Sequence, residues 1–331
     1  MSDINAALER LLDSDINISA SSISQGSDSH NYIRDVLKGK NDRDALFPRL
    51  VYGDFLSGSY ARGTKLKPLD DIDVMVVIDG SGLCVVNNGY VKDVEVRGSG
   101  KSDNPILQYM GPNSLLSSTT VMSLFQKALT DLHPNSKIRN DQQAVNVWLS
   151  TYGLGIDVVP CFHLIPRDGS QDHYYIPEGN GSDGWKTTNP KIDADISSAL
   201  HDRHNKLIKK IVRLAKYWNS VSNANRLRSY HLETIVWHIF DEKTDSVQSL
   251  EVGLINLFSS IDKWLANSCP DKTALGGPLD QYLLWDNRQS SRDKAQEALN
   301  ALVDTYVTHP SDAKLRERVW QQIFSNKLNF S

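Results

Sequence analysis

The run DIDVMVVI at residues 71–78 constrains the fold more than any other stretch of the chain. Apolar, mostly β-branched residues follow the two aspartates without the alternation of a half-exposed strand, and Asp-Gly ends the run. Such a run is typical of a strand that is covered on both faces. The sequence therefore predicts a mixed sheet with helices in the first half of the chain.

Three aspartates are candidate metal ligands. Asp71 and Asp73 would point to the same face of the strand, with Cα atoms ~7 Å apart. Two converging carboxylates repel, and a divalent cation such as Mg²⁺ removes that repulsion. Asp157 lies inside another apolar run, GLGIDVVPCF, and offers the third carboxylate that a two-metal site usually needs. The alternative is that Asp71 and Asp73 only cap a strand end, as we expect of Asp70; the surrounding motifs favour the metal site.

A glycine turn, GSYARGT, precedes the aspartates. Gly58 lets the backbone approach a ligand closely, and Ser59 can offer its hydroxyl and its N–H to a phosphate. Gly63 and Thr64 would shape the same loop. Arg62 could contact phosphate, although a solvated turn arginine is the favoured interpretation.

The remaining sequence predicts two different halves. Residues 19–29 read as a polar connection between two helices, and the segments at 96–114 and 166–190 have the composition of irregular loops. A helix is expected at about 115–132, followed by two strands within QAVNVWLSTYGLGIDVVPCFHLI. From about Asp193 onward the apolar periodicity is helical, with no convincing strand.

Composition excludes several classes of protein. A formal net charge of −4 over 331 residues does not suit a protein that coats nucleic acid or an anionic membrane. The three cysteines are dispersed and form no C-x-x-C pair, so they indicate neither a disulfide framework nor a zinc site. No signal peptide or membrane-spanning run is evident, and we expect a cytoplasmic protein with no membrane partner.

The motifs carry a family resemblance. GSYARGT followed by DDIDVMVVI resembles the Gly-Ser and Asp-x-Asp signature of the DNA polymerase beta-like nucleotidyltransferases. IKKIVRLAKYWNS and RLRSYHLETIVWHIF resemble the helical lobe of oligoadenylate synthase and cyclic GMP-AMP synthase. Bacterial relatives of those enzymes are the CD-NTases of anti-phage CBASS operons. The likeness covers roughly residues 50–240.

The resemblance implies an α+β fold with two lobes. Residues 1–192, including the N-terminal helices, would form the polymerase beta-like catalytic lobe with its mixed sheet. Residues 193–331 would form the C-terminal helical lobe, with the active site in the cleft between the two. The animal DNA sensor of this superfamily carries a zinc-binding loop, and no His/Cys cluster here could build one.

The resemblance also assigns site residues and cofactors. It implies two Mg²⁺ ions, with Mn²⁺ as a substitute, held by three acids, and a nucleotide bound by residues from both lobes. The metal ligands would be Asp71, Asp73 and Asp157. The donor-phosphate residues would be Gly58 and Ser59, and the remaining nucleotide-binding residues would be Lys216 and Ser229 on phosphate and Tyr230 on the base.

The residues of 206–218 support one of these assignments independently. An apolar stripe at helical spacing predicts a buried face, formed by Leu207, Ile211, Leu214 and Trp218. A basic face is formed by Lys206, Lys209, Arg213 and Lys216. We expect Lys206 and Lys210 to be solvated, and Lys216 to be the candidate triphosphate ligand. Tyr230 could equally be a core aromatic, and His231 and His238 are interpreted as structural.

The implied reaction is nucleotidyl transfer from NTPs, with ATP as the first expected substrate. Repeated transfer and ring closure would give a cyclic di- or trinucleotide second messenger. Some CD-NTases depend on HORMA-domain activators, which makes such a protein a candidate partner. Activation by double-stranded nucleic acid on the basic helix face is a weaker alternative.

Three rival functions remain open. A template-free polymerase acting on RNA ends would need an extended basic groove, which the net charge disfavours. Enzymes that transfer a nucleotide to a small molecule usually lack a K-Y-W and S-Y-H-L-E helical lobe. A catalytically dead scaffold is disfavoured because all three acids are present.

Overall fold

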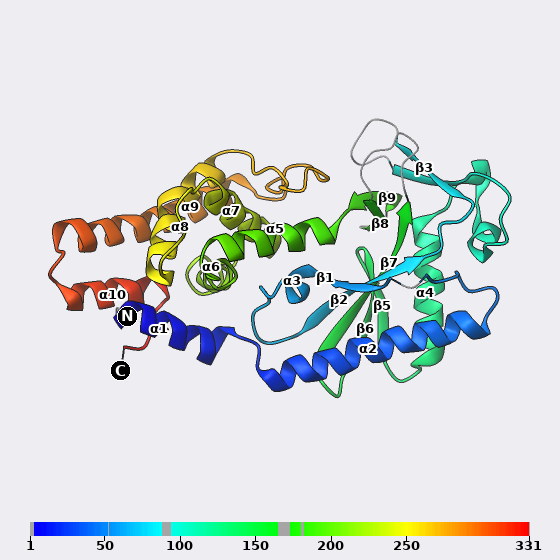
Figure 1. Cartoon of the computed structure of the whole chain (residues 1–331), viewed down its shortest axis with the longest axis horizontal. Helices are drawn as coiled ribbons and strands as arrows, with labels where there is room; N and C mark the ends of the chain where they lie inside the picture. Colours follow the sequence, from blue (N-terminus) through cyan, green and yellow to red (C-terminus); the bar gives the residue numbers. More distant parts are fainter. Residues whose placement is uncertain (1–2, 52, 88–93, 165–172, 180–181, 331) are drawn as a thin grey trace. The chain divides into compact units, whose positions relative to one another are not determined.

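The computed structural model describes residues 3–51, 53–87, 94–164, 173–179 and 182–330. The chain divides into two units, which we call the sheet unit and the helical unit (Figure 1). The sheet unit comprises Ser19–Ala61 and Leu69–Pro190. The helical unit comprises Met1–Ile18, Arg62–Pro68 and Lys191–Ser331.

In the described part of the sheet unit, nine strands form one mixed sheet. They are β1 (Phe55–Ser57), β2 (Asp71–Ile78), β3 (Leu83–Asn87), β4 (Val94–Gly98), β5 (Lys137–Asp141), β6 (Ala144–Leu149), β7 (Leu154–Leu164), β8 (His173–Gly179) and β9 (Ser182–Thr188). The main order is β1-β2-β7-β8-β9-β4-β3. The predicted strand at 71–78 is confirmed as β2, and the two strands predicted within residues 143–165 are confirmed as β6 and β7.

Strand β7 is the long central strand, and its two halves have different partners on one edge. Leu154–Val158 pair antiparallel with β6, and Phe162–Leu164 pair antiparallel with β8. The other edge of β7 pairs with β2 along the whole of β2, in parallel. This parallel pair places the two predicted acidic strands side by side.

Two long helices cover one face of the sheet, α2 (Ala20–Arg43) and α4 (Ser118–Leu132) (Figure 1). Alternate strand residues point toward them and are fully buried, including Ile72, Val74, Ile156 and Val158. The opposite face carries a second apolar cluster, formed by Met75, Val77, Ala144, Val159, Cys161, Tyr174 and Ile176. Because Asp71 and Asp73 alternate with Ile72 and Val74, the predicted site lies on this second face.

The prediction that residues 19–29 form a polar connection is wrong. They belong to α2, which begins directly after Ser19, and the Ser19 side chain caps it by accepting a hydrogen bond from the N–H of Ser22 at 3.1 Å. The helix also packs closely on the sheet at Gly26, where an added Cβ would lie 2.9 Å from Cδ1 of Ile72. Serine-rich composition concealed both the cap and this packing.

The segment at 166–190 is also more regular than predicted. Residues 165–172 and 180–181 lie outside the described residues, but β8 and β9 occupy much of the remainder and pair with each other. Pro177 and Gly179, residue types common in loops, sit at an irregularity of the ladder between these two positions. Strands β3, β4 and β5 were not predicted.

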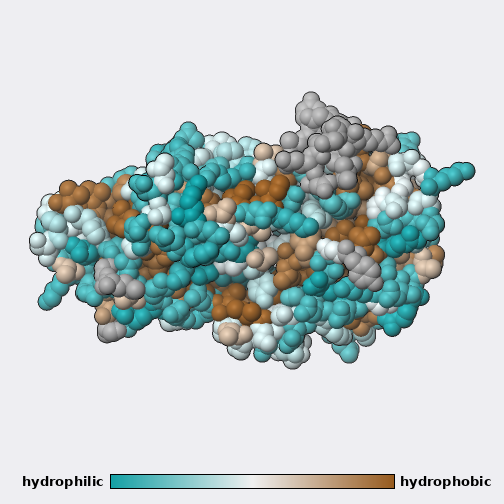
Figure 2. Space-filling view, viewed as in Figure 1, coloured by the Kyte–Doolittle hydropathy of each residue, from teal (hydrophilic) through white to brown (hydrophobic). Residues whose placement is uncertain are grey.

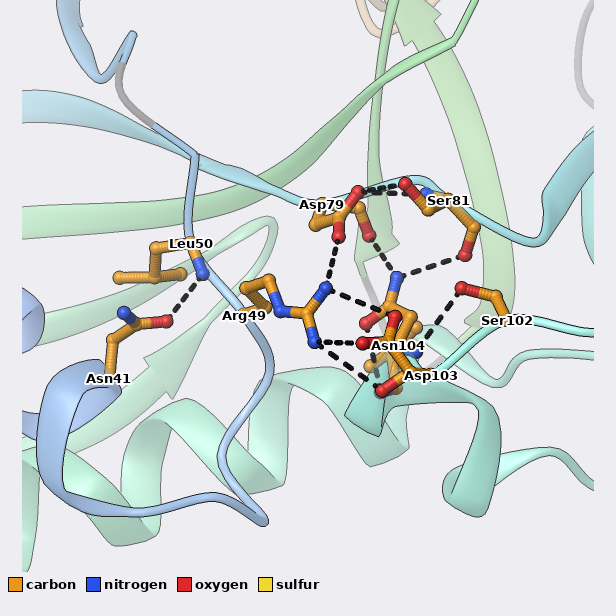
Figure 3. A network of polar contacts seen from close by, with 9 residues as sticks. Asn41, Arg49, Leu50, Asp79, Ser81, Ser102, Asp103 and Asn104 are labelled. Atoms are coloured by element: carbon orange, nitrogen blue, oxygen red, sulfur yellow. Dashed lines mark hydrogen bonds and ion pairs between the residues drawn. The ribbon is translucent and has the colours of Figure 1, made fainter.

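The segment at 96–114 is irregular for most of its length, as predicted. It contains two short 3₁₀ turns, η2 (Pro105–Tyr109) and η3 (Pro112–Ser114). Figure 3 shows how it is fastened to the end of β2: Asn104 Nδ2 donates to the carbonyl oxygens of Asp79, at 2.7 Å, and Ser81, at 3.0 Å. Arg49 pairs with Asp79 at 3.4 Å and with Asp103 at 3.3 Å. The insertion is therefore anchored by polar contacts.

The helical unit is built around one apolar core. Its elements are α1 (Asp3–Leu11), the π-helical turn η1 (Leu12–Ile16), α5 (Pro190–Arg203), α6 (Ile208–Ser222), α7 (Ser229–Asp241), α8 (Leu250–Ala266), α9 (Trp285–Val303), the π-helical turn η4 (Asp304–Thr308) and α10 (Ala313–Ile323). Between Lys191 and Phe330 no strand occurs among the described residues, which confirms the helical prediction.

Helix α1 and the turn η1 belong to the helical unit and α2 to the sheet unit, whereas the predicted division placed all of residues 1–192 in the catalytic lobe. Ile4, Leu8 and Leu12 are part of the helical core. Asn5 supports this placement, because its Nδ2 donates to Glu251 at 3.2 Å. The core face of an amphipathic helix does not reveal from sequence alone which other core it will join.

Two further observations concern the apolarity of the helices and of the surface. None of the described helices combines the length and the apolarity that crossing a bilayer requires. On the face drawn in Figure 2, hydrophilic residues predominate, with groups of hydrophobic residues between them.

Candidate active site

A row of polar residues crosses four neighbouring strands of the sheet. Ser57 on β1 is the register partner of Asp73 on β2, and Asp73 is the partner of Asp157 on β7. Asp157 is in turn the partner of Asn146 on β6. Register partners present their side chains on the same face of a sheet, so the two aspartates lie side by side. Asn146 Nδ2 donates to Oδ1 of Asp157 at 2.7 Å and fixes that carboxylate.

Asp71 shares this face, two residues before Asp73 on the same strand. Its register partner on β7 is Gly155, where an added Cβ would lie 2.7 Å from Nδ2 of Asn146. The side chains of Asp71, Asp73 and Asp157 are each partly exposed. Asp71 is the first residue of β2, and Asp73 is the third.

The glycine turn lies against the same row. Gly58 has φ +68°, a left-handed backbone conformation that disfavours any residue with a Cβ. A Cβ at this position would lie only 1.8 Å from Oδ2 of Asp73. The turn therefore approaches the carboxylate more closely than an alanine would permit. Ser59 follows within the short helix α3 (Gly58–Ala61) and is half-buried.

The side chains at this site have the chemistry that a divalent cation requires. Asp73 and Asp157 offer carboxylate oxygens from adjacent strands, and Mg²⁺ and Mn²⁺ prefer such ligands. Only a glycine at position 58 leaves room for the Asp73 carboxylate, since an added Cβ would lie 1.8 Å from its Oδ2. Among the residues that the structure describes, however, no three His, Cys, Asp or Glu side chains converge as a ready metal site. Asp71 therefore lies on the correct face without closing a three-acid cluster.

The predicted basic face of α6 is largely occupied by ion pairs and hydrogen bonds. Lys206 pairs with Asp202, and Lys210 pairs with Glu9 at 2.7 Å, both at the surface. Arg213 donates to the carbonyl oxygen of Gly63.

Lys216, the predicted triphosphate ligand, is only 5% exposed. Its Nζ donates to Glu233 at 2.8 Å and to the carbonyl oxygen of Thr64 at 3.2 Å. Arg62 joins the same carboxylate through Nε at 2.9 Å and is 6% exposed. The interpretation of Arg62 as a solvated turn arginine is therefore wrong: a buried anion from α7, distant in sequence, holds it.

Ser229 and Tyr230 begin α7. Ser229 is exposed, whereas Tyr230 is partly buried, with its hydroxyl donating to Oδ1 of Asp193 at 2.7 Å. The Arg62 guanidinium lies 5.5 Å from the centre of the Tyr230 ring. Burial raises the pKa of Asp193 to about 6, although the Tyr230 hydrogen bond and Arg62 oppose the rise.

Asp193→Asn should make the stability of the protein less dependent on pH. The folded-state pKa of Asp193, about 6, exceeds the unfolded value of 3.8, so the folded protein binds the extra proton between these limits. Stability from this group is complete below about pH 4 and is lost as pH rises through about 6, a loss of about 3 kcal/mol. We expect the Asn variant to melt at a higher temperature than the wild type near pH 8 and to match it near pH 4. If the melting temperature of the wild type instead rose relative to that of Asp193→Asn between pH 4 and pH 8, the raised pKa of Asp193 would be contradicted.

Known proteins similar to this chain support the family that its sequence motifs predicted. A model described as the Second Messenger Oligonucleotide or Dinucleotide Synthetase domain, SMODS, matches residues 1–96, which include the glycine turn and both aspartates of β2. A probable cyclic nucleotide synthase of Bacillus cereus is 24% identical over 98% of this chain and 97% of its own length. The cyclic AMP-AMP-AMP synthase of Acinetobacter sp. is 24% identical over 95% of this chain and 82% of its own length. These matches support the predicted resemblance to the CD-NTases of CBASS systems.

Solved structures agree with this CD-NTase assignment at the level of the fold. Chains of the Escherichia coli MS115-1 structures "CdnC:HORMA-deltaN complex" and "CdnC + ATP" superpose with TM-scores of 0.69 and 0.71. Each comparison covers 98% of both chains at 18% identity. The predicted α+β nucleotidyltransferase fold with a helical C-terminal part is confirmed.

Three further polar residues with informative contacts or positions were not singled out from the sequence. Asn146 interrupts an apolar strand, and Glu233 is a charge inside the buried run LETIVW of α7, so an unexplained polar residue was the signal in both cases. Lys186 pairs in register with Ile176 and shares the face of the aspartates. Burial lowers the pKa of Lys186, and Glu178 opposes that effect. No signal identified Lys186, because its strand was read as a loop.

His231 and His238 have the structural roles that the sequence suggested. Nδ1 of His231 lies 3.0 Å from the Tyr282 hydroxyl, and burial lowers the pKa of His231 to about 4. Nε2 of His238 lies 2.9 Å from the carbonyl oxygen of Pro270, and its ring stacks on Trp264. Both rings are therefore neutral packing groups at physiological pH.

Proposed function

We propose that this CD-NTase joins NTPs into a cyclic oligonucleotide second messenger. The observation that carries the proposal is the register of Asp73 with Asp157, with the Gly58 turn against the Asp73 carboxylate. Family relatives named for cyclic products supply the reaction class.

We further propose that the product contains adenine. The relatives named for a product are synthases of cyclic AMP-AMP-AMP in Acinetobacter sp., cyclic UMP-AMP in Rhodothermus marinus and cyclic GMP-AMP in Staphylococcus schleiferi. AMP is common to all three names. ATP is therefore the proposed first substrate, and a di- or trinucleotide is the proposed ring.

The proposed site residues are those that the resemblance assigned. Asp73 and Asp157 would hold a divalent cation, and Asp71 would complete the set when a nucleotide brings its own metal-bound phosphates. Two Mg²⁺ ions, or Mn²⁺ in their place, would supply charge neutralisation and lower the pKa of the attacking hydroxyl. Gly58 and Ser59 would contact the donor phosphates, Ser229 and Tyr230 the nucleotide, and Lys216 would reach phosphate only by exchanging a present hydrogen bond.

The proposed reaction is a displacement at phosphorus, to which side chains of this protein would contribute. An acceptor ribose hydroxyl attacks the α-phosphorus in line, a new P–O bond forms, and the bond to the bridging oxygen breaks so that pyrophosphate leaves. Asp157, whose carboxylate accepts a hydrogen bond from Asn146, would accept the hydroxyl proton. The same step, with the acceptor at the far end of the nascent chain, closes the ring.

The proposed partner class and cellular setting are taken from the relatives. Since the matched E. coli CdnC was solved with a HORMA protein, a HORMA-domain activator is the proposed partner class. We place the reaction in the bacterial cytoplasm, in anti-phage defence of the CBASS type.

Pyrophosphate release should depend on ATP and on a divalent cation. Purified protein with ATP and Mg²⁺ should release pyrophosphate, EDTA should stop the release, and excess Mg²⁺ or Mn²⁺ should restore it, because carboxylates alone cannot neutralise the leaving group. The release is followed by an enzyme-coupled phosphate assay, with GTP, CTP and UTP each alone for comparison. Release that continues undiminished in EDTA would refute the metal-dependent mechanism.

A further inference from the structure

The segment Arg62–Pro68 joins the glycine turn to the aspartate strand, yet it is held by the helical unit. Its contacts to that unit occur along most of its length. The Gly63 carbonyl accepts from Arg213, the N–H of Lys67 donates to the Ile16 carbonyl at 2.9 Å, and Leu66 packs on the helical core. In sequence, the segment begins shortly after Ser59 and ends shortly before Asp71, and both of these are residues of the proposed active site.

One carboxylate, that of Glu233, collects the strongest of these contacts. It accepts from Arg62 Nε at 2.9 Å, from Lys216 Nζ at 2.8 Å, and from the Thr64 hydroxyl at 3.0 Å. Glu233 and Thr64 are fully buried, and Arg62 and Lys216 nearly so. We call these four residues the Glu233 cluster.

The charges of the Glu233 cluster do not cancel, because two cations surround one anion. Burial alone would raise the pKa of Glu233, but Lys216 and Arg62 lower it to about 2, so the carboxylate is ionised at all physiological pH values. A buried ion pair is a weak source of stability, because apolar residues of similar size often serve as well. Such a cluster is better suited to fixing one geometry than to adding stability.

We propose that Glu233 is a positioning residue for the nucleotidyl-transfer site. Through Arg62 and Thr64 it fixes the start of the segment that follows Ser59, and through Lys216 it fixes the Thr64 carbonyl. The residue acts through the main chain and need not touch the nucleotide. This inference rests on the proposed function, because it assigns Glu233 to the same site.

A single hydroxyl offers the cleanest test, because Thr64→Val leaves both ion pairs of Glu233 intact. We expect Thr64→Val to raise the Kd for α,β-methylene-ATP with Mg²⁺ about fivefold or more, which corresponds to one lost hydrogen bond to a charged group. Thr64→Ser restores the hydroxyl and should restore the affinity. The Kd is measured by calorimetry on the full chain, beside the melting temperature.

The matched control is Thr234→Val, one residue from Glu233 on α7. Thr234 is equally buried, but its hydroxyl has no hydrogen-bond partner among the described residues, so its loss should leave the Kd unchanged. If Thr64→Val lowers the melting temperature but leaves the Kd at the wild-type value, the Glu233 cluster is structural only and the inference is wrong.

Two substitutions made together, which keep the net charge of the Glu233 cluster unchanged, distinguish an effect on positioning from an effect on stability. Glu233→Gln alone strands two buried cations and should lower the melting temperature strongly. Adding Arg62→Met, which leaves the proposed phosphate ligand Lys216 in place, removes one of them and should recover much of the melting temperature while the Kd remains high. Recovery of both would overturn the positioning role. Failure of the proposed function would appear elsewhere, as wild-type protein that binds the analogue yet forms no phosphodiester from ATP.

Discussion

Asp73→Asn is expected to abolish nucleotidyl transfer, with a loss of at least about 10³-fold in rate. Asp73 is the central member of the polar row, with Ser57 as its register partner on one side and Asp157 on the other. Asparagine keeps the size of the side chain but removes the charge that a cation needs. The measurement is pyrophosphate release from ATP at saturating Mg²⁺, with the melting temperature recorded to show that the variant is folded.

The control for this substitution lies just beyond the other end of the same strand. Asp79 follows β2 and accepts from the N–H of Ser81 at 2.9 Å and from Arg49 at 3.4 Å (Figure 3). Asp79→Asn makes the same chemical change at a partly exposed anchoring pair, where we expect little stability to be lost and most activity to remain. Comparable loss of activity in both variants would mean that charge on this strand, and not the row at Asp73, governs the reaction.

Gly58→Ala should produce the second large effect, a loss of about 10²-fold or more in kcat, because small displacements of reacting groups are costly. The new Cβ would lie 1.8 Å from Oδ2 of Asp73, so the carboxylate or the turn must move. The left-handed backbone at φ +68° adds strain of about 1–2 kcal/mol. The rate and the melting temperature should both be measured.

Gly153→Ala separates the clash from the strain. Gly153 has nearly the same backbone conformation, with φ +62°, but a Cβ there would meet nothing within 4 Å. This variant should lose stability by about the same strain and keep its activity. An inactive Gly153→Ala, or a fully active Gly58→Ala, would show that the close approach to Asp73 is not important for catalysis.

The sequence was most informative where local pattern and tertiary role coincide. The unbroken apolar run after Asp73 indicated a doubly covered strand, and Asp157 in a second such run indicated its acidic neighbour. Both strands formed as expected, and their parallel register placed the two carboxylates side by side. The register itself could not be derived, since it pairs two strands that lie far apart in the sequence.

Patterns failed where partners distant in sequence decide the outcome. Ala20–Ser29 form the start of a helix because the Ser19 cap and the packing at Gly26 compensate for weak propensity. Pro177 suggested a loop but marks an irregularity between two paired strands.

The same reason explains why Arg62 was misread as solvated and why the burial of Lys216 was not anticipated. Arg62 and Lys216 look like surface or phosphate-binding residues in sequence, because nothing local shows that Glu233, far along the chain, buries both. The charge of Glu233 within an apolar helix was the one available sign.

Identification of the product tests the central claim most directly. The wild-type protein is incubated with all four NTPs and Mg²⁺, treated with phosphatase, and its products are identified by mass spectrometry beside those of Asp73→Asn. We predict a phosphatase-resistant cyclic oligonucleotide that contains adenine and is absent from the Asp73→Asn reaction. Linear, phosphatase-sensitive chains alone, or nucleotide transferred to RNA or a small molecule, would contradict the assignment of this chain as a cyclic oligonucleotide synthase.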